Sequence, residues 1–199
     1  DPRTKFSNKD FPKQEQPVPG LQSKLDPKPD CGETSYTGYG RLNDYKMLVT
    51  GGDSAIGRAA AIAYAKEGAD VAINYLPAEQ QDAEEVQQVI EAAGRKAVLI
   101  PGDIRDEQFN YDLVETAYNE LGGLDNVTIV AGHQQYRESI KGFDTASFSE
   151  TFETNVYPIF WTVQKAVDYL QAGATITLTS SVQGYNPSPI LHDYAASKA

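Results

Sequence analysis

Residues 46–58 read KMLVTGGDSAIGR. The apolar run that ends at Thr50 passes into two glycines, and alanines with Ile62 then recur through residues 58–68 at helical spacings. Glycines between a strand and a helix let the backbone turn tightly and gather unpaired N–H groups at the helix start, where a phosphate binds. The stretch predicts a strand, a phosphate-binding turn and a helix. The alternative interpretation is an ordinary tight connection.

The same alternation of short apolar runs and helical stretches continues along the chain. Strands are expected over 46–50, 71–75, 97–101, 127–131 and 175–179. Helices are expected over 55–68, 78–93, 106–121 and 145–171. The strand runs are continuously apolar or β-branched, which is typical of strands buried on both faces. The pattern predicts an α/β fold with a doubly wound parallel sheet of the Rossmann type, which binds ligands at the carboxyl ends of its strands.

The first forty residues differ from the rest of the chain. They hold six of the eleven prolines and carry no helical or strand period. Proline lacks a backbone donor, so residues 1–40 are expected to form either a disordered tail or an extended arm laid on a protein surface. The expected anchors of such an arm are Phe6, Phe11, Leu21, Tyr36 and Tyr39. Residues 41–199 are expected to form a single domain.

Composition narrows the possible partners. The net charge is −11 and no basic stripe is visible, which argues against nucleic-acid binding. No run of 18 apolar residues is present, so no membrane span is expected. The single cysteine, Cys31, and two isolated histidines offer no metal-ligand spacing, so no metal is expected. A single unpaired cysteine fits the cytoplasm.

A second group of residues lies near the end of the chain. Tyr194 and Lys198 have the spacing YxxxK, which places the phenol and the ammonium on one face of a helix. Ser181 lies thirteen residues before Tyr194, just beyond the fifth expected strand. Asn155 lies within the expected helix 145–171. YxxxK alone is a weak pattern, but a serine at this offset after a strand makes the combination specific.

Together these residues resemble the short-chain dehydrogenases. The stretch from Thr50 to Gly57 is similar to the family's cofactor turn TGxxxGxG, with Ala55 in place of the middle glycine. The order Asn, Ser, Tyr, Lys is similar to the family's catalytic set. The proline-rich arm, VAG at 130–132 and QGYNPSP at 183–189 resemble the branch of bacterial aldehyde reductases and glucose/ribitol dehydrogenase-like proteins.

The resemblance implies an oxidoreductase that acts on CH–OH groups and moves a hydride between NAD(P) and an aldehyde, a sugar or a polyol. Tyr194 would donate a proton, while Lys198 would lower the pKa of the phenol and hold the nicotinamide ribose. Ser181 would polarise the carbonyl, and Asn155 would position a water. The cofactor-binding residues that the resemblance implies are Gly51, Asp53, Ser54, Ile56, Gly57, Asn74, Tyr75, Asp103, Ile104, Ala131, Gly132, Tyr194 and Lys198.

Cofactor choice depends on the end of the second expected strand. An acidic residue there normally binds the ribose 2′-hydroxyl of NAD, whereas this chain has Tyr75. No arginine or lysine follows at once to bind the 2′-phosphate of NADP. We therefore expect NAD or NADP, leaning toward NADP. Asp103, after the third expected strand, looks like the carboxylate that accepts from the adenine amino group.

The resemblance also implies a homo-oligomer, a tetramer by likeness, and a small-molecule substrate. It implies that the usual domain continues beyond Ala199 with two more strands and the loop that selects the substrate. Two other classes stay open. Ala55 favours a catalytically weak or inactive nucleotide-binding scaffold. A flavodoxin-like phosphate-binding domain would give Ser181, Tyr194 and Lys198 no role.

Overall fold

Five parallel strands form one sheet in the order β3-β2-β1-β4-β5 in the computed structural model, which describes residues 10–199. The strands are β1 (Lys46–Thr50), β2 (Asp70–Tyr75), β3 (Ala97–Pro101), β4 (Asn126–Ile129) and β5 (Thr175–Leu178). The α-helices are α1 (Ala55–Lys66), α2 (Gln80–Ala92), α3 (Glu107–Leu121), α4 (Thr145–Asn155), α5 (Tyr157–Ala166) and α6 (His192–Ser197). Three short 3-10 helices complete the elements: η1 (Gln22–Lys24), η2 (Pro77–Glu79) and η3 (Val182–Gly184). This order confirms the predicted doubly wound parallel sheet.

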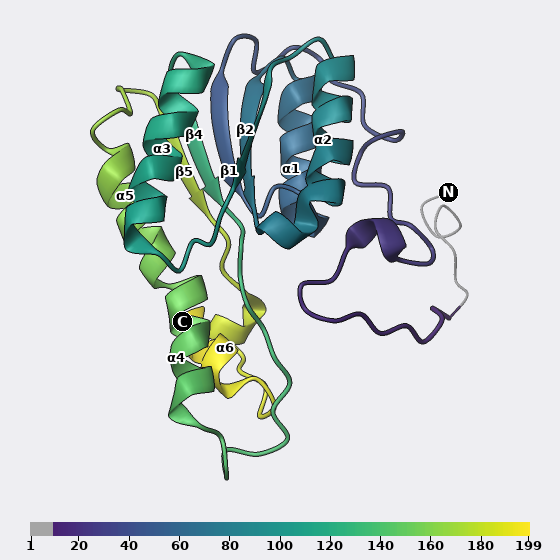
Figure 1. Cartoon of the computed structure of the whole chain (residues 1–199), viewed down its shortest axis with the longest axis vertical. Coiled ribbons are helices and arrows are strands. Elements are labelled where there is room, and N and C mark those ends of the chain that lie inside the picture. The colour runs from purple at the N-terminus through teal and green to yellow at the C-terminus, as the bar shows by residue number, and fades with distance from the viewer. Residues whose placement is uncertain (1–9) are drawn as a thin grey trace.

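Helices cover both faces of the sheet (Figure 1). On one face, α1 and α2 pack on the strands through a buried cluster that includes Val49, Ile62 and Val86. On the other face, α3 and α5 pack through a second cluster that includes Leu48 and Leu113. Successive side chains of β1 enter opposite clusters, because side chains alternate between the faces of a strand. This explains why the strand runs are apolar throughout.

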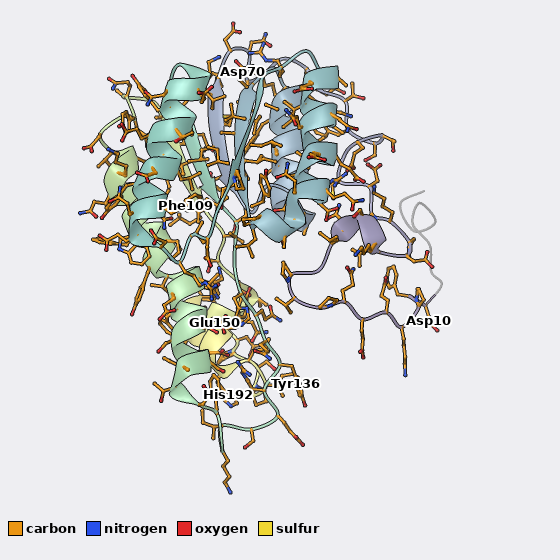
Figure 2. All side chains as sticks on the ribbon, viewed as in Figure 1. Asp10, Asp70, Phe109, Tyr136, Glu150 and His192 are labelled. Carbon is orange, nitrogen blue, oxygen red and sulfur yellow. The ribbon has the colours of Figure 1, made fainter. Side chains whose placement is uncertain are left out.

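The order of the strands reverses beside β1. The chain runs outward from β1 through β2 to β3, then returns to pair β4 with the other side of β1. Ligands of open α/β sheets bind at the carboxyl ends of the strands where the order reverses. In Figure 2, Asp70, at the start of β2, lies at the far end of the sheet from Glu150 and His192. The segments around Glu150 and His192 extend the molecule beyond the carboxyl ends.

The expected long helix over 145–171 is wrong in one respect, because the structure has two helices there. The helix α4 ends at Asn155, and α5 begins at Tyr157 with a proline in its first turn. Pro158 has no N–H to donate to the carbonyl of Thr154, and its ring crowds that carbonyl, so a continuous helix is broken here. Asn155 therefore ends a helix. No helix of residues 10–199 is long and apolar enough to cross a membrane.

Residues 21–40 of the arm lie against α1 and α2, and the described residues before them loop away from these helices (Figure 1). Two of its expected anchors are wrong: the side chains of Phe11 and Tyr39 are 75% and 81% exposed. Phe6 lies outside the described residues. The buried residue of this segment is Gln22, a polar one, because its amide finds hydrogen-bond partners inside. The domain boundary near residue 40 stays a prediction.

Candidate active site

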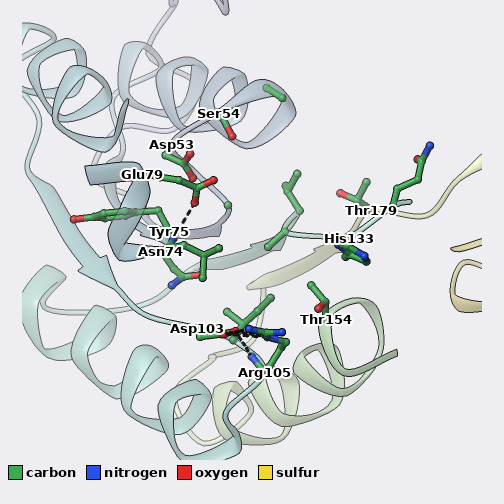
Figure 3. A pocket seen from close by; sticks show the side chains of 18 of the residues that line it. Asp53, Ser54, Asn74, Tyr75, Glu79, Asp103, Arg105, His133, Thr154 and Thr179 are labelled. Atoms are coloured by element: carbon green, nitrogen blue, oxygen red, sulfur yellow. Dashed lines mark hydrogen bonds and ion pairs between the residues drawn. The ribbon is translucent and has the colours of Figure 1, made fainter. Parts of the chain in front are cut away.

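A cleft of about 570 Å³ lies at the carboxyl ends of the strands, and residues of the glycine turn line it together with Tyr194 and Lys198. Figure 3 shows its two walls, with Asp53, Ser54 and Glu79 on one side and Asp103, Arg105 and Thr154 on the other. The predicted residues that line it are Gly51, Asp53, Ser54, Ile56, Asn74, Tyr75, Asp103, Ile104, Ala131, Gly132, Tyr194 and Lys198. The volume is within the range of about 300–1,000 Å³ of ligand pockets.

The glycine turn needs its glycines for two different reasons. Gly51 has φ +62°, and a Cβ there would stand 3.0 Å from the Cα of Ala131. Gly57 lies beneath the cleft, where a Cβ would stand 1.9 Å from the carbonyl oxygen of Gly51. Gly57 therefore lets the first turn of α1 pack directly on the turn. Such close backbone approach is what a phosphate-binding turn requires.

Ala55 occupies the position of the family's middle glycine with φ +47°. Its side chain is exposed and lines the cleft. A left-handed conformation costs an L-residue roughly 1–2 kcal/mol, because Cβ approaches the following carbonyl oxygen. The backbone thus keeps the shape that glycine would adopt freely, at the expense of local strain.

Substituting Ala55→Gly is expected to raise the free energy of unfolding by about 0.5–1 kcal/mol, because relief of strain outweighs the entropy cost of glycine. Thermal unfolding measures this as a rise in Tm of roughly 2–4 °C per kcal/mol. The matched control is Ala60→Gly in the same helix, which should lower stability by about 0.5–1 kcal/mol. Equal destabilisation by both changes would contradict the prediction.

The side chains at the end of β2 are already engaged. Asn74 is buried, and its amide donates to the carbonyls of Ile100 (3.2 Å) and Gly102 (3.1 Å). The Tyr75 hydroxyl donates to Gln80 Oε1 at 2.6 Å, away from the cleft. Asn74 therefore ties β2 to β3, and Tyr75 presents its ring to the cleft wall.

Asp103 already forms an ion pair with another residue of the chain. Arg105 Nη2 lies 2.6 Å from Asp103 Oδ2, and Arg105 Nη1 lies 3.0 Å from Glu150 Oε1. Burial raises the pKa of Asp103, but the hydrogen bonds from Arg105 outweigh it, and the pKa lies below its ordinary value. Asp103 is thus a carboxylate at neutral pH, and its Oδ2 is already paired with the Arg105 guanidinium. Sequence reasoning missed Arg105 and Glu150, although Arg105 follows Asp103 by only two residues.

Two carboxyl groups, Asp53 and Glu79, stand together at the other wall of the cleft (Figure 3). Asp53 is 1% exposed, and its Oδ2 has no hydrogen-bond partner in residues 10–199. Burial raises the pKa of Asp53. Burial, reinforced by the negative charge of Asp53, raises the pKa of Glu79 to about 7. Glu79 lies four residues beyond β2, so a search that stopped at Tyr75 missed it.

At the opposite end of the cleft, α6 presents Tyr194 and Lys198. Lys198 Nζ lies 5.8 Å from the centre of the Tyr194 ring and donates to the Thr179 carbonyl at 2.8 Å. Burial lowers the pKa of Lys198. The spacing predicted from the sequence therefore places both groups in one cleft with the glycine turn.

Ser181 and Asn155 do not line this cleft. Ser181 caps η3 by accepting from the Gln183 N–H at 3.2 Å. The Asn155 amide donates to the His133 carbonyl and to Ser197 Oγ, both at 2.9 Å, and its Oδ1 accepts from the His133 N–H at 2.6 Å. Asn155 thus joins the segment after β4 to α6. The lining residues His133 and Thr179 had no recognisable signal in the sequence.

The family model for short chain dehydrogenases matches residues 46–199. The chain belongs to the short-chain dehydrogenase family. Among its relatives, the "uncharacterized oxidoreductase YhxD" of Bacillus subtilis is 61% identical over 193 residues, covering 97% of this chain and 64% of YhxD. A glucose and ribitol dehydrogenase homologue of Arabidopsis thaliana is 34% identical, covering 94% of this chain and 67% of that protein. The predicted family and its branch are confirmed.

Solved structures agree with the fold of this short-chain dehydrogenase. A short-chain dehydrogenase from Burkholderia cenocepacia, solved in complex with NADP, superimposes with a TM-score of 0.74 at 35% identity. The match covers 79% of this chain and 64% of that one. The chain therefore spans about two thirds of the length of the proteins it matches. Short-chain dehydrogenases use NAD or NADP, the cofactors expected from the sequence.

Proposed function

We propose that this short-chain dehydrogenase transfers a hydride between NAD(P) and a carbonyl or alcohol substrate, an aldehyde, a sugar or a polyol. The observation that carries the proposal is that Tyr194 and Lys198 line the same cleft as the glycine turn. A nucleotide bound at the turn would have its other end beside the phenol. The oxidoreductase names of its relatives support the same reaction class.

The residues of the cleft fit a dinucleotide. Any Cβ at Gly51 would fill the space against Ala131, and α1 begins four residues later at Ala55, so that the positive dipole end of the helix is available to a bound phosphate. Gly51, Ser54 and Ile56 would hold the pyrophosphate. Asn74, Asp103 and Ile104 would flank the adenosine, with Ala131 and Gly132 beside the nicotinamide half.

When bound, the nicotinamide supplies or accepts the hydride. In the reductive direction, Tyr194 donates its phenolic proton to the substrate oxygen, which becomes the alcohol. Lys198, whose Nζ lies 5.8 Å from the centre of the Tyr194 ring, would stabilise the negative charge that this transfer leaves on the phenol oxygen. The family resemblance gives Ser181 the role of polarising the carbonyl, although its hydroxyl caps η3 and does not line the cleft. Asn155 positions a water of the proton relay by fixing His133 and Ser197.

Turnover with a panel of aldehydes, sugars and polyols, each with NADH and NADPH, tests the proposal. We expect oxidation of NAD(P)H that depends on substrate and follows saturation kinetics. Cofactor binding without turnover of any substrate would favour the second function, a nucleotide-binding scaffold. The strained Ala55 and the position of Ser181 outside the cleft lining are the observations that favour it.

Glu79→Gln is expected to strengthen NADPH binding relative to NADH by about tenfold, because it removes a negative charge beside the expected 2′-phosphate. Because the pKa of Glu79 is about 7, its negative charge grows as the pH rises from 6.5 to 8, so wild-type NADPH affinity should fall over this range. In Glu79→Gln this fall should disappear. Fluorescence titration at several pH values measures it. The control is Glu91→Gln, near the end of α2 and outside the cleft, whereas Glu79 is the N-cap residue of that helix.

A homo-oligomer, a tetramer by family likeness, working in the cytoplasm is part of the same proposal. Exposed apolar side chains on and just after α5 support an oligomer. They are Tyr157, Phe160 and Val167, exposed by 47%, 64% and 60%. Contiguous exposed apolar side chains mark association surfaces in soluble proteins. Sedimentation velocity tests the state directly.

A further inference from the structure

Gln22, in the proline-rich arm, contacts the cofactor turn. Its side-chain Oε1 accepts a hydrogen bond of 2.6 Å from the backbone N–H of Ala55. Ala55 is the first residue of α1 and lines the cleft. Gln22 itself is 4% exposed and does not line the cleft. The arm thus contacts the turn on the side away from the cleft, through the buried side-chain amide of Gln22.

The position of Gln22 is fixed from two sides. The fully buried carboxylate of Asp82, on α2, accepts from the backbone N–H groups of Gln22 and Ser23, the latter at 3.1 Å. The Gln22 Nε2 donates to Cys31 Sγ at 3.2 Å. Because both ends of the residue are held, its amide oxygen is presented to Ala55 in one orientation.

The arm also contacts α1 near both of its ends. Arg58 is 2% exposed and pairs with Glu33 of the arm at 2.7 Å. At the other end of α1, Lys66 Nζ donates to the arm carbonyls of Gly32 and Glu33, both at 2.7 Å. These contacts make α1 and the arm one packed unit, so movement of the arm is transmitted to the turn.

The turn needs such support for a physical reason. Ala55 has φ +47°, and a strained residue keeps its conformation only when its surroundings over-determine it. The N-cap residue Ser54 makes no side-chain hydrogen bond to the helix start. Gln22 therefore takes over part of the role of an N-cap side chain. It accepts the hydrogen bond from the N–H of the strained Ala55, and the next N–H groups of α1 stay open to the cleft.

We propose that Gln22 is a positioning residue for the cofactor, and that docking of the arm and binding of NAD(P) are coupled through the backbone of Ala55. The proposal rests on the proposed NAD(P) binding. It assigns the arm a function in the binding site of its own chain. Cofactor binding should in turn hold the arm more tightly on α1, because coupling between two binding events is reciprocal.

Titration of NADPH and NADH fluorescence tests this in the full chain. Gln22→Ala should raise the Kd of both cofactors about three- to tenfold, as loss of one buried hydrogen bond implies, with kcat at saturating cofactor unchanged. Gln14→Ala is the control, because within residues 10–199 the Gln14 side chain bonds only to the exposed backbone of Asp26. In an Ala55→Gly background the effect of Gln22→Ala should shrink, since glycine needs no support at this φ. A general loss of folding would not show this dependence on residue 55.

Hydrogen exchange of the wild type gives a second measurement that needs no variant. NADPH should slow exchange of the backbone amides in residues 20–40. Unchanged exchange, or Kd values for Gln22→Ala equal to or below those of the wild type, would overturn the coupling. A wild type that binds neither cofactor would instead overturn the proposed function.

Discussion

Tyr194→Phe is expected to lower kcat by about 10²–10⁴, the range for loss of a general acid, while the Kd of NAD(P)H stays within about twofold. Phenylalanine keeps the ring that lines the cleft and removes only the hydroxyl. Without that proton donor, the developing alkoxide of the substrate must take its proton from water. Stopped-flow turnover and cofactor titration measure the two quantities separately.

A matched control is Tyr185→Phe, which removes the same hydroxyl from a side chain that is 91% exposed and outside the cleft. It should leave kcat within about twofold. If Tyr194→Phe kept more than a tenth of the wild-type kcat, proton donation would have to be assigned elsewhere. Binding of the cofactor without dependence of turnover on Tyr194 would favour the scaffold.

Gly57→Ala should raise the Kd of the cofactor by more than about tenfold. It should also lower the free energy of unfolding by about 1–3 kcal/mol. The added Cβ would stand 1.9 Å from the Gly51 carbonyl oxygen, and this atom belongs to backbone that no rotamer change can move. The turn has to open away from α1. Opening displaces the N–H groups that would hold the pyrophosphate.

Gly94→Ala separates the two effects. Gly94 has φ +75° and nothing within 4 Å of an added Cβ, so the change costs about 1 kcal/mol of backbone strain far from the cleft. Thermal unfolding should therefore show a loss for both variants, and cofactor titration a loss for Gly57→Ala alone. Normal cofactor affinity in Gly57→Ala would refute the assignment of this turn.

Much of the site was predictable because its residues are close in sequence or follow a strand. The glycines and Ile56 lie within a few residues of β1, and Tyr194 and Lys198 are one helical turn apart. Ala55 stood out as a departure, but only the backbone angle of +47° shows that the turn keeps its shape under strain. The break before α5 was signalled in the sequence by Pro158, which cannot donate a backbone hydrogen bond inside a helix.

The remaining features required the tertiary structure. Glu79 faces Asp53, Arg105 occupies the Asp103 carboxylate, and Gln22 reaches Ala55 across 33 residues of chain. No period or motif marks such pairs. The pairs Glu79–Asp53 and Gln22–Ala55 arise because packing of α1, α2 and the arm on the sheet brings distant backbone segments together. Arg105 is near Asp103 in the sequence, but only the path of the chain after β3 shows that its guanidinium meets that carboxylate.

The parallel sheet and the position of the glycine turn could be predicted from local periodicity and spacing, and the family from the resemblance of the motifs. The packed structure was needed to show which carboxyl groups share the cleft, which predicted residues already have partners, and that the arm contacts the turn. Local spacing fixes the direction of side chains within one element. Burial and charge at the site depend on the distances between elements, which the packed core sets.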